Sequence, residues 1–207
     1  KRIKLMKIKI CGLNPTRDVQ LCIDYNVNYL GFVFYEKSPR NLNLPDIKIL
    51  SSYNKKNSAF VAVTVNPSDE FLKKYLLGNF DFIQLHGSET RSRVIEIKNM
   101  GFKVIKAIKI KNAKDIDKHR EFDAADIVLF DTPGMENSLE FPKNLITKLP
   151  TGEKYALAGS ISEDNVENIS KLGVNFFDLS SSLESQFGYK DHLKIKSFIN
   201  KINELKD

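Results

Sequence analysis

Eight short hydrophobic runs rich in β-forming residues recur along the chain, and a more polar stretch follows each of them. The steps between runs range from 21 residues (Ile8 to Tyr29) to 31 residues (Tyr29 to Phe60). A strand of about five or six residues, a helix of about eleven and two short loops fill such a step. The predicted strands are KIKIC (7–11), YLGFVF (29–34), AFVAVTV (59–65), FIQLH (82–86), KVIKAIKI (103–110), IVLFD (127–131), YALAG (155–159) and FFDLS (176–180).

The polar stretches carry the spacing of amphipathic helices. Residues 162–173 begin with a candidate N-cap, Ser162, and stop at Gly173. Residues 191–205 repeat apolar positions at helical spacing. In the stretch between the first two runs, Cys22 falls on the apolar face, where we expect a small buried residue.

Alternating strands and helices favour a parallel sheet with right-handed crossovers. Eight such units in 207 residues predict an α/β fold, a single (β/α)8 TIM barrel. No linker or low-complexity segment interrupts the series, so we expect one domain over residues 1–207, with residues 1–6 a candidate N-terminal extension. The alternative is a doubly wound open sheet; its dinucleotide-binding form is disfavoured because no GxGxxG follows an early strand.

The charge balance at first suggests a nucleic-acid surface. Lys and Arg number 32 against 26 Asp and Glu, which leaves a net charge of +6. Arg is the residue suited to bidentate phosphate recognition, yet only positions 2, 17, 40, 91, 93 and 120 carry it, and the lysines are spread along the chain. We therefore expect no nucleic-acid partner, and a weakly positive field that favours a small anionic substrate.

The remaining composition excludes several classes of protein. Hydrophobic residues make up 42% and charged residues 28%, a globular balance. No apolar run approaches the ~18 residues of a membrane span, and the basic start is too short and interrupted for a secretory signal. Cys11 and Cys22 form no CxxC pattern, which fits the reducing cytoplasm. His86, His119 and His192 are far apart in sequence, so we expect no metal site.

Candidate chemistry gathers where the predicted strands end, because ligands of such barrels bind at the carboxyl ends of the strands. A thiol, a guanidinium, a carboxyl group and two loops suited to anions stand there. This set suits proton transfer on a small anionic substrate. The residues are Cys11, Arg40, Asp131, Gly159-Ser160 and Ser180-Ser181-Ser182.

Short motifs at these strand ends give a specific signal when taken in order. They are KICG (9–12), GFVFYEKSPRN (31–41), VAVTVN (61–66), IQLHG (83–87), LFDTPG (129–134), LAG (157–159) and DLSSSLES (178–185), followed by GYKD (188–191). With them the chain resembles the phosphoribosylanthranilate isomerase family from Lys9 almost to its C-terminus. The resemblance implies a (β/α)8 barrel and a cofactor-independent Amadori rearrangement of N-(5-phosphoribosyl)anthranilate, a step of L-tryptophan biosynthesis.

The resemblance also implies roles for individual residues. Cys11 would be the general base and Asp131 the general acid, while Arg40 would hold the anthranilate carboxylate. An unperturbed Cys is about 3% thiolate at pH 7, so a nearby cation or helix N-terminus would assist the base. Further residues would bind the phosphate or line the site, namely Gly159, Ser160, Ser181 and Ser182 for the phosphate and Asp178 for the lining.

Three segments depart from the family pattern. Residues 133–141 lack its Gly-Gly-Thr-Gly stretch, and Ser160 and Ser182 replace glycines. A serine fits these positions without strain only where φ is negative, and a positive φ would cost about 1–3 kcal/mol.

The altered loops keep a second hypothesis open, a non-catalytic barrel that binds a phosphorylated small molecule. Another phosphosugar barrel, such as a relative of indole-glycerol-phosphate synthase, is a third reading, although the lysine chemistry of that enzyme has no evident counterpart at these strand ends. Oligomeric state is left open between a monomer and a homodimer.

Overall fold

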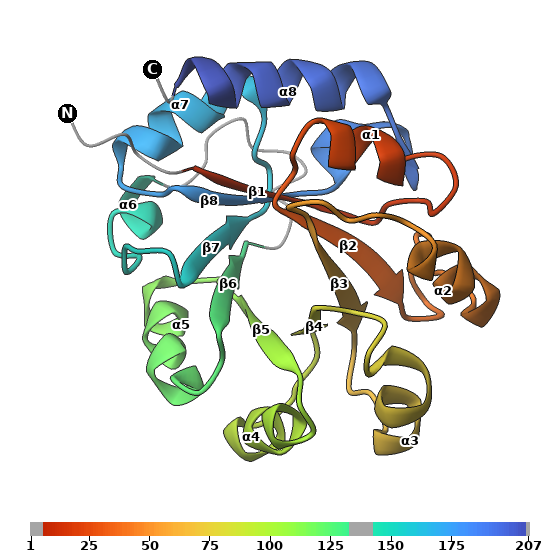
Figure 1. Ribbon diagram of the computed structural model, residues 1–207. Coiled ribbons are helices and arrows are strands. Elements are labelled where there is room, and N and C mark those ends of the chain that lie inside the picture. The colour runs from red at the N-terminus through yellow and green to blue at the C-terminus, as the bar shows by residue number, and fades with distance from the viewer. Residues whose placement is uncertain (1–5, 133–142, 206–207) are drawn as a thin grey trace.

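A computed structural model describes residues 6–132 and 143–205 of the chain (Figure 1). Eight parallel strands close into a barrel in sequence order, and helices surround it (Figure 1). The open-sheet alternative is wrong because the first strand pairs with the last, with Lys9 opposite Asp178. The strands are β1 (Lys7–Cys11), β2 (Tyr29–Phe34), β3 (Ala59–Thr64), β4 (Phe82–Leu85), β5 (Lys103–Lys109), β6 (Ile127–Asp131), β7 (Tyr155–Ala158) and β8 (Phe176–Leu179).

The predicted runs coincide with the strands to within one residue. Longer helices begin and end close to the predicted signals: Asn165 accepts a hydrogen bond from the Ser162 amide at 2.9 Å at the start of α7. Cys22 is 0% exposed, as expected. The helices are α1 (Val19–Asp24), α2 (Leu44–Ser51), α3 (Asp69–Phe71), α4 (Arg91–Asn99), α5 (Ala113–Asp117), α6 (Lys143–Ile146), α7 (Glu163–Lys171) and α8 (His192–Glu204).

Some local structure was not predicted. α3 continues into a π-helical turn, η1 (Leu72–Leu76), and α5 into a 3-10 turn, η2 (Lys118–Phe122). After β8 the chain forms a 3-10 turn, η3 (Ser181–Leu183), and a small antiparallel hairpin, β9 (Glu184–Gln186) with β10 (Tyr189–Lys190). The strands of this hairpin are too short to produce an alternating sequence pattern.

Strand alternation separates two apolar layers. Inward positions such as Val61, Val63 and Ile105 pack together inside the barrel, whereas Ile8 and Ile10 pack in the outer layer with the helices. At the bottom of the interior, Tyr29 stacks on Phe176 with 5.0 Å between ring centroids and meets Phe82 edge-on at 5.5 Å. Aromatic rings therefore close the lower end, and polar inward residues lie above them.

In the part of the chain that the structure describes, no helix is both long enough and apolar enough to cross a membrane. Residues 133–141, where the sequence departs from the family pattern, lie outside the described residues.

Candidate active site

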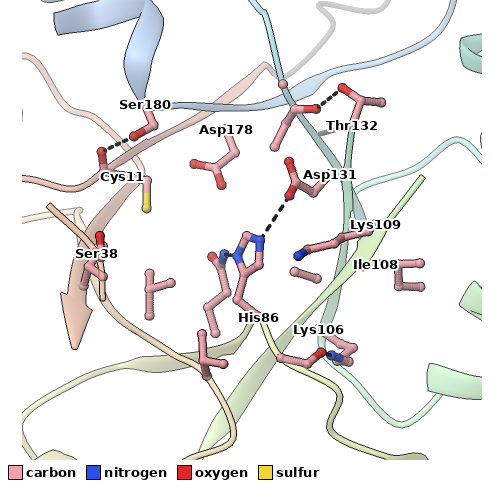
Figure 2. A pocket seen from close by; sticks show the side chains of 18 of the residues that line it. Cys11, Ser38, His86, Lys106, Ile108, Lys109, Asp131, Thr132, Asp178 and Ser180 are labelled. Atoms are coloured by element: carbon pink, nitrogen blue, oxygen red, sulfur yellow. Dashed lines mark hydrogen bonds and ion pairs between the residues drawn. The ribbon is translucent and has the colours of Figure 1, made fainter. Parts of the chain in front are cut away.

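A cavity of about 1140 Å³ opens at the carboxyl ends of the strands (Figure 2). The structure brings all eight of the predicted site residues to its wall. They are Cys11, Arg40, Asp131, Gly159, Ser160, Asp178, Ser181 and Ser182. The roles of these residues in binding and catalysis remain predictions.

Cys11 is the last residue of β1, and its side chain reaches the cavity (Figure 2). Its carbonyl oxygen accepts a hydrogen bond from the Ser180 hydroxyl at 3.1 Å, which ties the end of β1 to the loop after β8. Burial raises the pKa of the Cys11 thiol, and the ammonium groups of Lys9 and Lys190 act in the opposite direction. Thiolate formation at this position therefore depends on its cationic neighbours.

Asp131 is the last residue of β6 and is linked to the end of β4. Its Oδ2 lies 3.1 Å from Nε2 of His86, and the other ring nitrogen of His86 lies 3.0 Å from Nε2 of Gln84 (Figure 2). Oε1 of Gln84 has no hydrogen-bond partner among the described residues. The imidazole has two tautomers. With the proton on Nε2 the ring donates a hydrogen bond to Asp131, and with the proton on Nδ1 the ring accepts one from a protonated Asp131.

A buried ion pair lies next to the thiol. The Nζ atom of Lys9 is 2.9 Å from both carboxylate oxygens of Asp178, and the two side chains are 1% and 6% exposed. Burial alone lowers the pKa of Lys9, but the charges of Asp178 and Cys11 outweigh it, and the pKa is raised. The short ion pair and this direction of the pKa both favour the ammonium form of Lys9 inside the barrel.

Arg40 is held from the hairpin after β8. Its Nε and Nη2 atoms donate to Glu184 at 2.6 and 2.7 Å, and Lys190 donates to the same carboxylate at 2.8 Å. Burial by itself would raise the pKa of Glu184, but these two partners lower it to about 2. Glu184 therefore occupies the guanidinium edge formed by Nε and Nη2. Only the edge that contains Nη1 is left for a ligand.

The two predicted phosphate loops lie side by side because Ala158 of β7 is paired with Asp178 of β8. Gly159 has a φ of +101°, and a Cβ there would overlap Thr132. Ser160 also has a positive φ, +46°, so the strain considered above applies to it. Ser182 lies in η3 and is not among the residues with positive φ, so its replacement of glycine carries no such cost.

Sequence reasoning missed several charged residues at the site. Lys9 of β1 lies beside Cys11 beneath the cavity wall. Lys109 of β5 lines the cavity and is the strand neighbour of Asp131 (Figure 2). Lys106 also lines the cavity, where its Nζ lies 2.9 Å from buried Glu89. Period-two alternation was the signal that could have found both, since it leads from Cys11 to Lys9 on β1 and from Ile105 and Ala107 to Lys109 on β5.

The described residues contain no cluster of three or more His, Cys, Asp and Glu side chains arranged to hold a metal ion.

The closed parallel barrel with a cavity at the carboxyl ends of its strands defines a protein of the (β/α)8-barrel class. Comparison with known sequences gives the family: the model described as N-(5'phosphoribosyl)anthranilate (PRA) isomerase matches residues 8–201. The chain therefore belongs to the N-(5'-phosphoribosyl)anthranilate isomerase family.

Curated relatives with that name align over nearly their whole length. The protein from Thermoanaerobacter sp. strain X514 is 36% identical over 98% of this chain and 100% of its own. The protein from Agrobacterium fabrum is 34% identical over 95% of this chain and 94% of its own.

Solved structures agree with the sequence comparison. Phosphoribosyl anthranilate isomerase from Thermotoga maritima superposes with a TM-score of 0.85 at 26% identity, covering 96% of this chain and 99% of that one. A structure of the isomerase in complex with reduced 1-(o-carboxyphenylamino)-1-deoxyribulose 5-phosphate gives a TM-score of 0.82 at 26% identity, covering the same shares of the two chains.

Proposed function

We propose that this protein converts N-(5'-phosphoribosyl)anthranilate into 1-(2-carboxyphenylamino)-1-deoxyribulose 5-phosphate, the isomerisation that serves L-tryptophan biosynthesis. One observation carries the proposal beyond family membership. The Cys11 thiol and the Asp131 carboxyl group, from β1 and β6, enter one cavity from different walls (Figure 2). A base and an acid placed apart in this way can act on two positions of the same sugar.

Asp131 acts first in this proposal, as the general acid. It donates a proton to the furanose ring oxygen, and the bond between that oxygen and C1 breaks to give an open-chain Schiff base. His86, 3.1 Å from the carboxyl group, orients it toward the cavity. The proton ends on the hydroxyl group that the ring oxygen becomes.

Cys11 acts second, as the general base. Its thiolate removes the proton from C2, and the electron pair of that bond moves to form an enolamine. The enolamine then gains a proton at C1 and loses the one on the C2 hydroxyl, which leaves a ketone at C2. The product is an isomer of the substrate, so no other reactant is consumed.

Binding is assigned to the remaining cavity residues. Arg40 holds the anthranilate carboxylate through the guanidinium edge that Glu184 leaves unused. The phosphate binds to the loops after β7 and β8, at Gly159, Ser160, Ser181 and Ser182, where backbone N–H groups serve as donors. Asp178 lines the site and keeps Lys9 in place.

The proposal extends to a cytoplasmic protein of one domain, acting as a monomer or homodimer on a small molecule and needing no metal or organic cofactor. Both cysteines are free thiols, which is consistent with a reducing compartment.

The test is a direct assay on the purified protein. Loss of phosphoribosylanthranilate is followed by its fluorescence, and the ketose product is identified by mass and chromatography. Turnover with a product of unchanged mass supports the proposal. Calorimetric binding of the substrate without product would instead support the non-catalytic barrel and contradict the proposal.

A further inference from the structure

The ion pair of Lys9 and Asp178 occupies a place where this fold does not need charge. Both side chains are nearly inaccessible, at 1% and 6% exposed. The interiors of such barrels are usually filled by branched apolar residues, and a buried ion pair seldom gives more stability than an apolar replacement. Packing therefore does not explain why this ion pair is present.

A glycine of the neighbouring strand brings the ammonium of Lys9 and the thiol together. A Cβ on Gly31 of β2 would lie 3.2 Å from Sγ of Cys11 and 3.2 Å from Nζ of Lys9. Both atoms thus border the one small space that the missing side chain leaves. Lys9 and Cys11 are two residues apart on β1, so their side chains leave the strand on the same side.

Other charges around the thiol are largely compensated by partners of their own. Lys190 of β10 and Arg40 after β2 both bind the carboxylate of Glu184 in β9. On the wall formed by β4 and β6, His86 and Asp131 are paired with each other.

Lys9 has a partner too, Asp178 of β8, whose negative charge opposes the thiolate. It differs from the other cations because its Nζ also borders the thiol itself.

We propose that Lys9 is a positioning residue whose ammonium group stabilises the thiolate form of Cys11, with Asp178 fixing that ammonium and Gly31 leaving room for the contact. The inference rests on the proposed function, since the thiolate matters only if Cys11 is the base. Burial raises the pKa of the thiol, and without Lys9 less positive charge opposes that effect. The fraction of thiolate at neutral pH therefore falls.

The experiment measures the ionisation of Cys11 without using turnover. The rate of alkylation by iodoacetamide is followed against pH, and the modified cysteine is identified by peptide mass. Lys9→Met removes the charge and keeps an unbranched side chain of similar length; we expect the apparent pKa of Cys11 to rise by about one to three pH units. Cys22, fully buried with a pKa raised to about 12, serves as the internal control and stays unmodified while the protein is folded.

Lys7→Met is the matched variant. Lys7 lies two residues earlier on the same strand and pairs with Glu153 at 2.8 Å, so the change removes an equal charge away from the thiol. It should leave the Cys11 titration unmoved. An unchanged or lowered pKa in folded Lys9→Met overturns the proposal.

If Lys9→Met does not fold because Asp178 loses its partner, Asp178→Asn is compared with the double variant Lys9→Met/Asp178→Asn. The pKa of Cys11 must be higher in the double variant, and equal values overturn the proposal. A Cys11→Ala protein with full isomerase activity would instead remove the base assignment, whatever the alkylation shows, so the two failures are distinguishable.

Discussion

Nε2 of His86 lies 3.1 Å from Oδ2 of Asp131, while Nδ1 of the same ring faces the side-chain amide of Gln84 at 3.0 Å. A proton on Nδ1 would leave Nε2 free to accept a hydrogen bond from the protonated carboxyl group, which is the state that a general acid requires, but the Nε2 amide group of Gln84 that faces Nδ1 in this structure can only donate. A proton on Nε2 favours the carboxylate. The residues that choose the tautomer therefore influence whether Asp131 can act.

Replacement of His86 tests this arrangement. We expect His86→Asn to lower kcat by about 10- to 100-fold, because Asn cannot contact both Asp131 and Gln84. This loss is only part of the whole contribution of general acid–base catalysis. KM should change little. Steady-state kinetics across pH measure both constants, and a wild-type kcat would show that the imidazole does not assist the acid.

Replacement of Arg40 tests its proposed role in binding the anthranilate carboxylate. Arg40→Lys keeps the charge but loses the planar fork, so we expect KM to rise by about tenfold or more with a smaller effect on kcat. Arg17→Lys is the control, because Arg17 binds Asp18 and does not line the cavity. Equal effects of the two substitutions would remove Arg40 from the carboxylate site.

Ser160 and Ser182 give opposite predictions for stability although both replace a glycine of the family pattern. At Ser160, with φ at +46°, a change to Gly relieves strain that exceeds the chain entropy it costs, so the free energy of unfolding should rise by up to about 1 kcal/mol. Ser182→Gly relieves nothing and should lower it by about 0.5–1 kcal/mol. Urea denaturation measures both, and a loss of stability in Ser160→Gly would contradict the strain argument.

Glu184 predicts a pH dependence of stability. Its pKa in the folded protein is about 2, below the ordinary 4.5, so its pairs with Arg40 and Lys190 stabilise the fold fully above about pH 4.5. That contribution is lost as pH falls from there toward 2. Between pH 4.5 and pH 2, the wild-type protein should lose more stability than Glu184→Gln. The control variant Glu204→Gln, at an exposed residue, should behave as wild type. Parallel curves for all three in acid denaturation would show that Glu184 is not so paired.

The barrel could be predicted from sequence because its strands are buried on both faces. Runs such as YLGFVF and IVLFD therefore stand out, and they match β2 and β6 residue for residue. The small hairpin β9–β10 could not be predicted in this way, because its strands are short and mostly exposed outside Glu184 and Lys190.

The candidate site was predictable to the extent that strand ends meet at one end of a parallel barrel. Cys11 and Asp131 are terminal strand residues, so topology alone brings them to the cavity. The partners of these groups depend on side-chain packing between distant strands. That Glu184 occupies one edge of Arg40, or that Lys9 lies beside the thiol, follows from contacts that no single stretch of sequence contains.

The central claim is that Cys11 and Asp131 carry out the proton transfers. It is tested most directly by the rate of phosphoribosylanthranilate conversion in Cys11→Ala and Asp131→Ala, compared with wild type at saturating substrate after each variant is shown to be folded. We expect kcat to fall by about 10²- to 10⁴-fold in each. Full activity in both variants would contradict it.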